Sequence, residues 1–287
     1  MGKPEISIVT PSFNMLPFLK LCSASVCDQE VNLEHIVMDG GSTDGTFEWL
    51  KDNQNVISKS EKDNGMYNAL NKAIDRAQGD IIGHLNCDEQ YLPGVLKFVL
   101  EIFDENPQVD FIAADFLVID KEGGLLAYRK SFQPRWPYFF SNYLYTTTCT
   151  LFYRHKIFTQ CRFNETYKSI ADVIFLYEVM KKGYKGMHVK KYFSVFIFSG
   201  TNLSLSPISN VEKKKFNDTL PKWYRILKPL FFALFFGERV LKNTYYEKSP
   251  LSYSIFTKES LSERKTFVKL NPSFRLEFKF KPAAITH

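Results

Sequence analysis

The chain of 287 residues has little of what several classes of protein need. Its five cysteines form no Cys-x-x-Cys pair and no zinc spacing, which argues against a structural zinc site. They suit a reducing compartment, where thiols act as small apolar side chains. No charged-then-apolar segment opens the chain, and the longest apolar run of its C-terminal part, 229–237, is far shorter than the roughly 20 residues that span a bilayer. We therefore expect a cytoplasmic protein.

Two phosphate-binding motifs are also missing. Neither Gly-x-Gly-x-x-Gly nor a Walker-type loop occurs, so dinucleotide-binding and P-loop proteins lose most of their support. Basic charge is scarce in the larger part of the chain as well. Residues 1–205 carry 21 Lys and Arg against 24 Asp and Glu, whereas residues 206–287 carry 16 against seven. The excess of basic residues belongs to the C-terminal part, and we expect no nucleic-acid partner for the main domain.

Apolar patterns with strand and helix periodicity alternate three times within the first 90 residues. Such alternation is typical of an α/β fold with a parallel sheet and right-handed crossovers. After Asp115 the pattern changes to a hairpin of 116–119 and 125–128, a helix over 172–182 and a strand over 188–198. The expected strands of the first part are 5–10, 33–38, 56–58, 81–85 and 111–114, and its expected helices lie at 16–26, after 46, at 66–77 and at 93–103.

A short buried strand, 81–85, runs directly into hard oxygen ligands. Asn86, Asp88 and Glu89 follow it, and ligands of open α/β sheets bind beyond the carboxyl ends of the strands. A divalent metal and a phosphorylated ligand are expected there. Taken alone, a solvated acidic turn explains these residues equally well.

Other acidic residues recur at predicted strand ends, at Asp39 and Asp115. Asp39 precedes a Gly-rich turn, where Gly41 allows a ligand to approach the backbone closely, and its carboxylate suits a ribose or base. Without a glycine cradle, a diphosphate needs a carboxylate-held Mg²⁺ or Mn²⁺. Asp88 is the best candidate ligand, with Glu89 as a second.

Four segments resemble, in order, the family 2 glycosyltransferases with the GT-A fold: 7–14, 39–46, 60–72 and 79–89. The resemblance implies an inverting transferase of nucleotide-diphosphate sugars with a mostly parallel sheet flanked by helices. It places Asn86-Cys87-Asp88 at the family's Asp-x-Asp metal motif. Asn86 departs from the first aspartate of that motif, Glu89 stands where a second aspartate is usual, and Asn68 stands where Asp is common. The donor-binding residues expected from the matching positions are Thr10, Pro11, Asn14, Asp39, Gly41, Asp63, Asn86 and Cys87.

An inverting transfer also requires a base on the acceptor side. Ala171-Asp172, at the start of a predicted helix, resembles the family's (Glu/Ala)-Asp, which makes Asp172 the candidate catalytic residue. The alternative is that Asp172 only caps the helix. Residues 198–204 resemble the Gly-rich segment that closes the family's domain, and Thr148-Cys149 stands where relatives often have His-Gln.

These assignments divide the chain into a GT-A domain, 1–205, and a basic aromatic extension, 206–287. Within the domain, 1–115 is the nucleotide-binding half and 116–205 the acceptor half. Within the extension, 213–242 suits a helix lying on the inner face of an anionic membrane, or one packing its phenylalanines against the domain.

The predicted function is transfer of a sugar from a nucleotide-diphosphate sugar to a saccharide or lipid-linked acceptor in surface polysaccharide biosynthesis. A noncatalytic nucleotide-sugar-binding module is the alternative from another class. A nucleotide-sugar pyrophosphorylase fits less well, because such enzymes normally have a Gly-rich basic loop after the first strand, where this chain has Pro11-Ser12-Phe13-Asn14.

Overall fold

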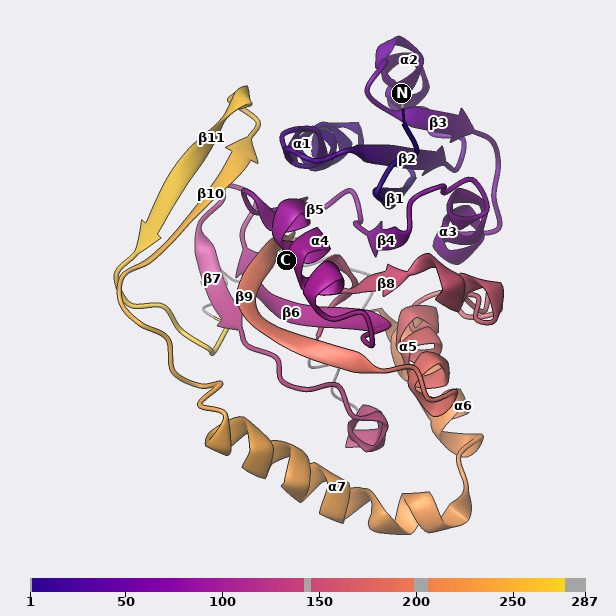
Figure 1. Ribbon diagram of the computed structural model, residues 1–287, viewed down its shortest axis with the longest axis vertical. Coiled ribbons are helices and arrows are strands. Elements are labelled where there is room, and N and C mark those ends of the chain that lie inside the picture. The colour runs from indigo at the N-terminus through magenta and orange to yellow at the C-terminus, as the bar shows by residue number, and fades with distance from the viewer. Residues whose placement is uncertain (1, 142–145, 199–205, 277–287) are drawn as a thin grey trace, which may run out of the picture.

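A mixed, curled sheet of nine strands forms the centre of the computed structural model, which describes residues 2–141, 146–198 and 206–276 (Figure 1). The strands run in the order β3-β2-β1-β4-β8-β6-β9-β5, and β7 pairs with β6. Their bounds are β1 (Ile6–Ser12), β2 (Leu33–Asp39), β3 (Ile57–Ser60), β4 (Ile81–His84), β5 (Glu89–Tyr91), β6 (Phe111–Ile119), β7 (Leu125–Arg129), β8 (Phe152–Arg154) and β9 (Gly186–Ile197).

The first four strands confirm the predicted alternation. β1 pairs in parallel with β2 on one side and β4 on the other, and β3 continues the parallel set. Every residue of β1 and β4 is buried, as expected of strands covered on both faces. The helices between and beyond them are α1 (Leu16–Cys27), α2 (Thr46–Asp52), α3 (Met66–Ile74), α4 (Val95–Glu105) and α5 (Ala171–Lys181). The carboxyl ends of β1, β2 and β4 therefore meet at one edge.

The second half of the sheet is less parallel than predicted. β8 lies antiparallel between β4 and β6, and β5 lies antiparallel beside β9. The predicted end of a strand at Asp115 is wrong, because β6 continues through it to Ile119 as an almost wholly buried apolar run. Asp115 is a core residue whose carboxylate accepts hydrogen bonds from Ser131 N (2.8 Å) and His188 Nε2 (2.9 Å). The predicted hairpin is confirmed as β6 and β7.

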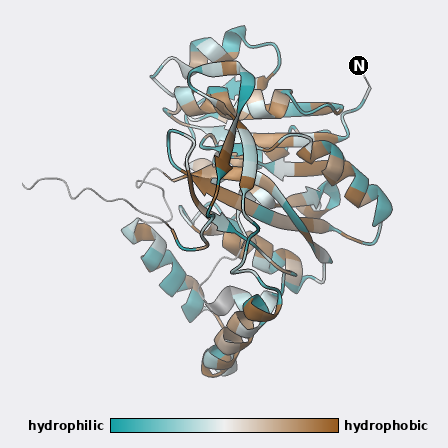
Figure 2. Cartoon of the chain, turned by 90° about the vertical axis from the view of Figure 1, so that its left-hand side faces the viewer, coloured by the Kyte–Doolittle hydropathy of each residue, from teal (hydrophilic) through white to brown (hydrophobic). Residues whose placement is uncertain are grey.

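Apolar side chains cover both faces of the sheet, and Figure 2 shows the hydrophobic colour concentrated on its strands. One cluster packs α3 and α5 against residues such as Val9, Ile82 and Phe111. The other packs α1 and α4 against residues such as Ile8 and Ile112. The sheet is thus the middle layer of three.

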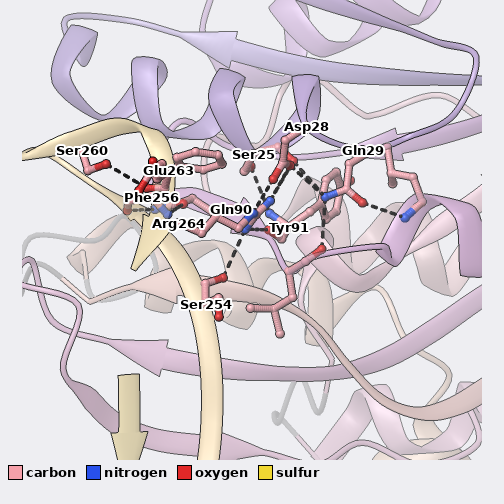
Figure 3. A network of polar contacts seen from close by, with 12 residues as sticks. Ser25, Asp28, Gln29, Gln90, Tyr91, Ser254, Phe256, Ser260, Glu263 and Arg264 are labelled. Carbon is pink, nitrogen blue, oxygen red and sulfur yellow. Dashed lines mark hydrogen bonds and ion pairs between the residues drawn. The ribbon is translucent and has the colours of Figure 1, made fainter. Parts of the chain in front are cut away.

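The C-terminal part adds two helices and a hairpin: α6 (Pro207–Asp218), α7 (Lys222–Leu241), β10 (Leu251–Thr257) and β11 (Ser260–Lys269). Gln90 of β5 pairs both side-chain amide atoms with the backbone of Phe256, at 3.1 and 2.9 Å. Arg264 donates two hydrogen bonds to the Asp28 carboxylate, at 2.5 and 2.6 Å, and one to the Tyr91 carbonyl (Figure 3). The hairpin therefore docks on the first half of the chain.

Helix α7 lies along the lower edge of the molecule in Figure 1. It buries Tyr224 and Phe235, and Phe235 packs on Phe132 and Tyr138 with ring centroids 5.5 and 5.7 Å apart. None of the helices in the described ranges is both long and apolar enough to cross a bilayer.

Candidate active site

The loop after β2 is built around the buried carboxylate of Asp39. That carboxylate accepts hydrogen bonds from the backbone N–H groups of Gly41 (3.2 Å) and Ser42 (3.0 Å) and from the hydroxyls of Ser42 (2.5 Å) and Ser60 (2.6 Å). Gly41 has φ of 85°, a left-handed conformation that favours glycine. Asp39 therefore fixes the shape of the turn, and it lies at the edge of the sheet where the carboxyl ends of β1, β2 and β4 meet.

The residues that end and follow β1 form hydrogen bonds with this turn and with neighbouring strands. Asn14 accepts a hydrogen bond from Thr43 N at 2.8 Å and donates its own backbone N–H to Ser42 Oγ at 2.7 Å. The Thr10 hydroxyl is fully buried and bonds His35 Nε2 at 3.0 Å, and the Pro11 carbonyl accepts the Cys87 thiol. Thr10 and Pro11 are thus buried within β1, whereas Asn14 orders the Gly-rich turn.

Asp63 and Phe13 lie against the backbone of Gly40. A Cβ placed on Gly40 would lie 2.8 Å from an Asp63 carboxylate oxygen and 3.3 Å from the Phe13 ring. Asp63 also accepts the Gly65 N–H at 2.7 Å. Phe13 is 61% exposed, and the sequence analysis assigned it no role. An exposed ring directly after β1 suits stacking on a nucleobase.

The predicted metal motif lies where β4 ends. The side-chain Oδ1 of Asn86 pairs with His84 Nε2 at 2.9 Å, so the buried His84 is hydrogen-bonded within the core. Asp88 is half-buried in the following turn. Glu89 is buried in β5, accepts the Asn86 N–H at 2.7 Å, and has a pKa raised to about 8 by burial and by the Asp88 carboxylate.

These residues fit a cation that is shared with a ligand better than one enclosed by protein. The described residues contain no group of three or more His, Cys, Asp or Glu side chains that could hold a metal ion. Mg²⁺ in phosphate-binding sites typically uses one or two carboxylates, with waters and phosphate oxygens completing its shell. Asp88 can supply one such carboxylate, whereas the buried Glu89 accepts the Asn86 N–H and so supports the loop backbone.

Asp172 lies in the first turn of α5, opposite α3. Its Oδ1 accepts a hydrogen bond from the Tyr67 hydroxyl at 3.0 Å. Burial raises the pKa of Asp172, and the bonds from Tyr67 and from N–H groups of the helix's first turn oppose that rise. Asp172 and His84 line the same largely apolar cavity, together with Phe163 and Tyr153.

This cavity is a small void of the apolar core between β4 and α5, and it is too small to hold a substrate. His84 borders it and bonds Asn86, so the strand end that carries Asp88 and the helix start that carries Asp172 lie on one side of the sheet. The sequence analysis gave no role to Tyr67, although it stands inside the matching segment 60–72, where it could have been noticed. Thr148 also lines the cavity, but the predicted Gly-rich closing segment falls largely on residues 199–205, outside the described ranges.

Comparison with known proteins gives the family. The chondroitin synthase of Pasteurella multocida (strain Pm70) is 25% identical over 224 residues, 74% of this chain but only 22% of that protein. The putative teichuronic acid biosynthesis glycosyltransferase TuaG of Bacillus subtilis (strain 168) is 33% identical over 109 residues, covering 36% of this chain and 43% of that protein. The chain thus spans less than half of either relative.

Solved structures share the GT-A fold at low sequence identity. S. aureus TarS 1–349 in complex with UDP-GlcNAc superposes with a TM-score of 0.62 and 17% identity, covering 83% of this chain and 73% of that one. The mannosyltransferase PcManGT from Pyrobaculum calidifontis, in complex with GDP-Man and Mn²⁺, has a TM-score of 0.55 and 15% identity, covering 81% and 69%. The profile described as glycosyl transferase family 2 matches residues 7–172, more than half of the chain. The protein belongs to that family.

Proposed function

We propose that this glycosyltransferase moves a sugar, with inversion, from a nucleoside-diphosphate sugar to a saccharide or lipid-linked acceptor in surface polysaccharide biosynthesis. The carrying observation is that Asp172 lines the same cavity as His84, which bonds the donor motif at Asn86. The names of the relatives, which include a chondroitin synthase and a teichuronic acid glycosyltransferase, favour a polysaccharide product.

In this proposal, Asp172 is the general base. The acceptor oxygen attacks the anomeric carbon opposite the diphosphate, the bond to the diphosphate oxygen breaks, and the hydroxyl proton passes to the carboxylate. Tyr67 holds one carboxylate oxygen in place, so the carboxylate loses less orientational freedom when the transition state forms. Burial raises the pKa of Asp172, which makes it a stronger base than an exposed aspartate.

The donor is bound in this proposal by the loops after β1, β2 and β3. Asp39 and Asp63 are the acceptors for ribose or base hydroxyl and N–H groups, and Phe13 offers a ring face to the base. Asn14 and Gly41 shape the turn that meets the nucleotide. Asn86 and Cys87 fix the strand end from which Asp88 reaches the diphosphate.

Asp88 is the residue that we assign to a Mn²⁺ or Mg²⁺ ion. Such an ion, when bound, would neutralise the charge of the departing diphosphate. One solved structure of similar fold, the mannosyltransferase PcManGT in complex with GDP-Man and Mn²⁺, supports this cofactor class. Glu89 keeps the Asn86 backbone in position by its hydrogen bond and is not needed as a ligand.

The test is a panel of UDP-, GDP- and dTDP-sugars, each with Mn²⁺, screened by thermal stabilisation and then by release of nucleoside diphosphate. One donor should both stabilise the protein and be turned over. Stabilisation without turnover in the presence of any tested acceptor would favour the noncatalytic binding module. The absence of stabilisation by every nucleotide sugar would contradict both interpretations.

We also propose peripheral contact of 213–242 with the inner face of the cytoplasmic membrane. α7 exposes apolar side chains that the helical period brings to one face, Trp223, Ile226, Leu227, Leu230, Leu234 and Leu241, and two more on other faces, Phe232 and Val240. Basic residues flank them, namely Lys213, Lys214 and Lys215 of α6 and Lys222, Arg225 and Lys242. An apolar stripe with basic borders suits a helix in the headgroup region of an anionic bilayer.

A further inference from the structure

Helix α6 makes a contact that the proposed chemistry has not used. The carboxylate of Glu212 is only 8% exposed and points at the segment that leads into α5. Its Oε1 accepts the backbone N–H of Lys168 at 2.6 Å, and its Oε2 accepts those of Ser169 at 2.9 Å and Ile170 at 3.3 Å. One side chain from the C-terminal extension thus binds three successive backbone donors.

Those three donors have a special place in the fold. They precede the first turn of α5: Ile170 is the N-cap residue, and none of the three N–H groups is one of the first-turn donors that an N-cap side chain would accept. Backbone N–H groups that are withdrawn from water need a partner. Glu212 supplies that partner from a helix 42 residues further along the chain.

Asp172 follows Ile170 by two residues, so the conformation of 168–170 sets the direction in which its carboxylate points. Tyr67 of α3 holds that carboxylate from one side at 3.0 Å. α6 also contributes Lys213, whose positive charge lowers the pKa of Asp172. The candidate base is therefore held by α3 and by the first helix of the extension.

We propose that Glu212 is a positioning residue for Asp172, so that the extension completes the catalytic domain. This inference rests on the proposed function, because it assumes that Asp172 is the base. Glu212 does not touch the substrate. Its role is to keep the entry to α5 in the conformation that presents Asp172 to the acceptor hydroxyl.

The experiment compares Glu212→Ala and Glu212→Gln with a matched control, Glu238→Gln. Glu238 also ties the extension to the domain, by accepting Tyr138 Oη at 2.6 Å and Arg135 Nε at 3.2 Å, but it holds residues 135–138 and not the entry to α5. Turnover is measured as the release of nucleoside diphosphate from the donor identified in the panel. The rate is divided by the concentration of protein that binds UDP or GDP in the presence of Mn²⁺. That normalisation removes loss due to unfolded protein.

Glu212→Ala should lower kcat on the order of 10- to 100-fold, with the nucleotide Kd within about twofold of the wild type, because small misplacement of a reacting group costs that much. Glu212→Gln keeps one acceptor oxygen and should fall between Ala and the wild type, whereas Glu238→Gln should keep the wild-type kcat. Equal losses in Glu212→Ala and Glu238→Gln, or none in either Glu212 variant, would overturn the inference. If Asp172→Asn keeps wild-type turnover, the proposed function itself fails. If Asp172→Asn is inactive but the Glu212 variants turn over like the wild type, only the role of Glu212 fails.

Discussion

The donor side and the base side of this site are built in different ways. On the donor side, Asp39, Asn14 and Asp63 are bonded by residues of their own or a neighbouring motif loop, all within the first 65 residues. On the base side, Asp172 takes its hydrogen bond from Tyr67, 105 residues earlier. Glu212 adds a third distant segment. The donor loops are thus fixed by local sequence, whereas the base depends on tertiary assembly.

The largest effect on nucleotide binding should come from the donor side. Asp88→Ala should weaken Mn²⁺-dependent nucleotide binding by at least about 100-fold, since a metal contributes several kcal/mol to a phosphate site. The matched control is Asp80→Ala, because Asp80 flanks the opposite end of β4 and is exposed, with Lys3 as its partner. Calorimetry with UDP or GDP, with and without Mn²⁺, measures the change. If both variants bind alike, Asp88 is not the ligand.

A second experiment examines the extension apart from the chemistry. Leu230→Glu with Leu234→Glu places two charges on the exposed side of α7 and should reduce binding to phosphatidylglycerol-containing vesicles by at least roughly 100-fold. The control, Leu261→Glu with Leu270→Glu, charges two exposed apolar residues in and beside the hairpin.

Co-sedimentation with anionic and with pure phosphatidylcholine vesicles measures how vesicle binding depends on the apolar residues of α7 and on the charge of the lipid. If the wild-type protein does not bind anionic vesicles, the proposed membrane contact is refuted. A concentration-dependent dimer that the α7 variant abolishes would assign the stripe to a second copy of the chain.

A smaller effect is expected at Tyr67→Phe, which removes the hydrogen bond that opposes the rise in the pKa of Asp172. The pKa should therefore rise further, and the base, active when deprotonated, should be lost at higher pH than in the wild type. The acid limb of kcat against pH should move upward, with a loss of roughly tenfold on that limb. A limb displaced to lower pH, or an unchanged profile, would contradict this role for Tyr67.

The same contrast explains what could be predicted from the sequence. The Gly-rich turn after β2, the polar turn after β4 and the β6–β7 hairpin are encoded by neighbouring residues, and the structure has each of these elements. Beyond β4 the sheet is only partly parallel: β6 pairs in parallel with β9 but antiparallel with β8, and the apolar run of β6 does not reveal which strand it pairs with or in which direction. Glu212 could not be found, because a glutamate in a Lys-rich helix looks like a solvated surface residue until the fold brings it against 168–170. The division of the chain at residue 205 stays a prediction.

The most direct test of the account is single-turnover transfer by Asp172→Asn with the donor identified in the panel and Mn²⁺. Loss of the base should lower the rate about 10²- to 10⁴-fold while nucleotide affinity stays at the wild-type value. A transfer rate within about threefold of the wild type, at saturating donor, would show that another group accepts the proton and would contradict the account.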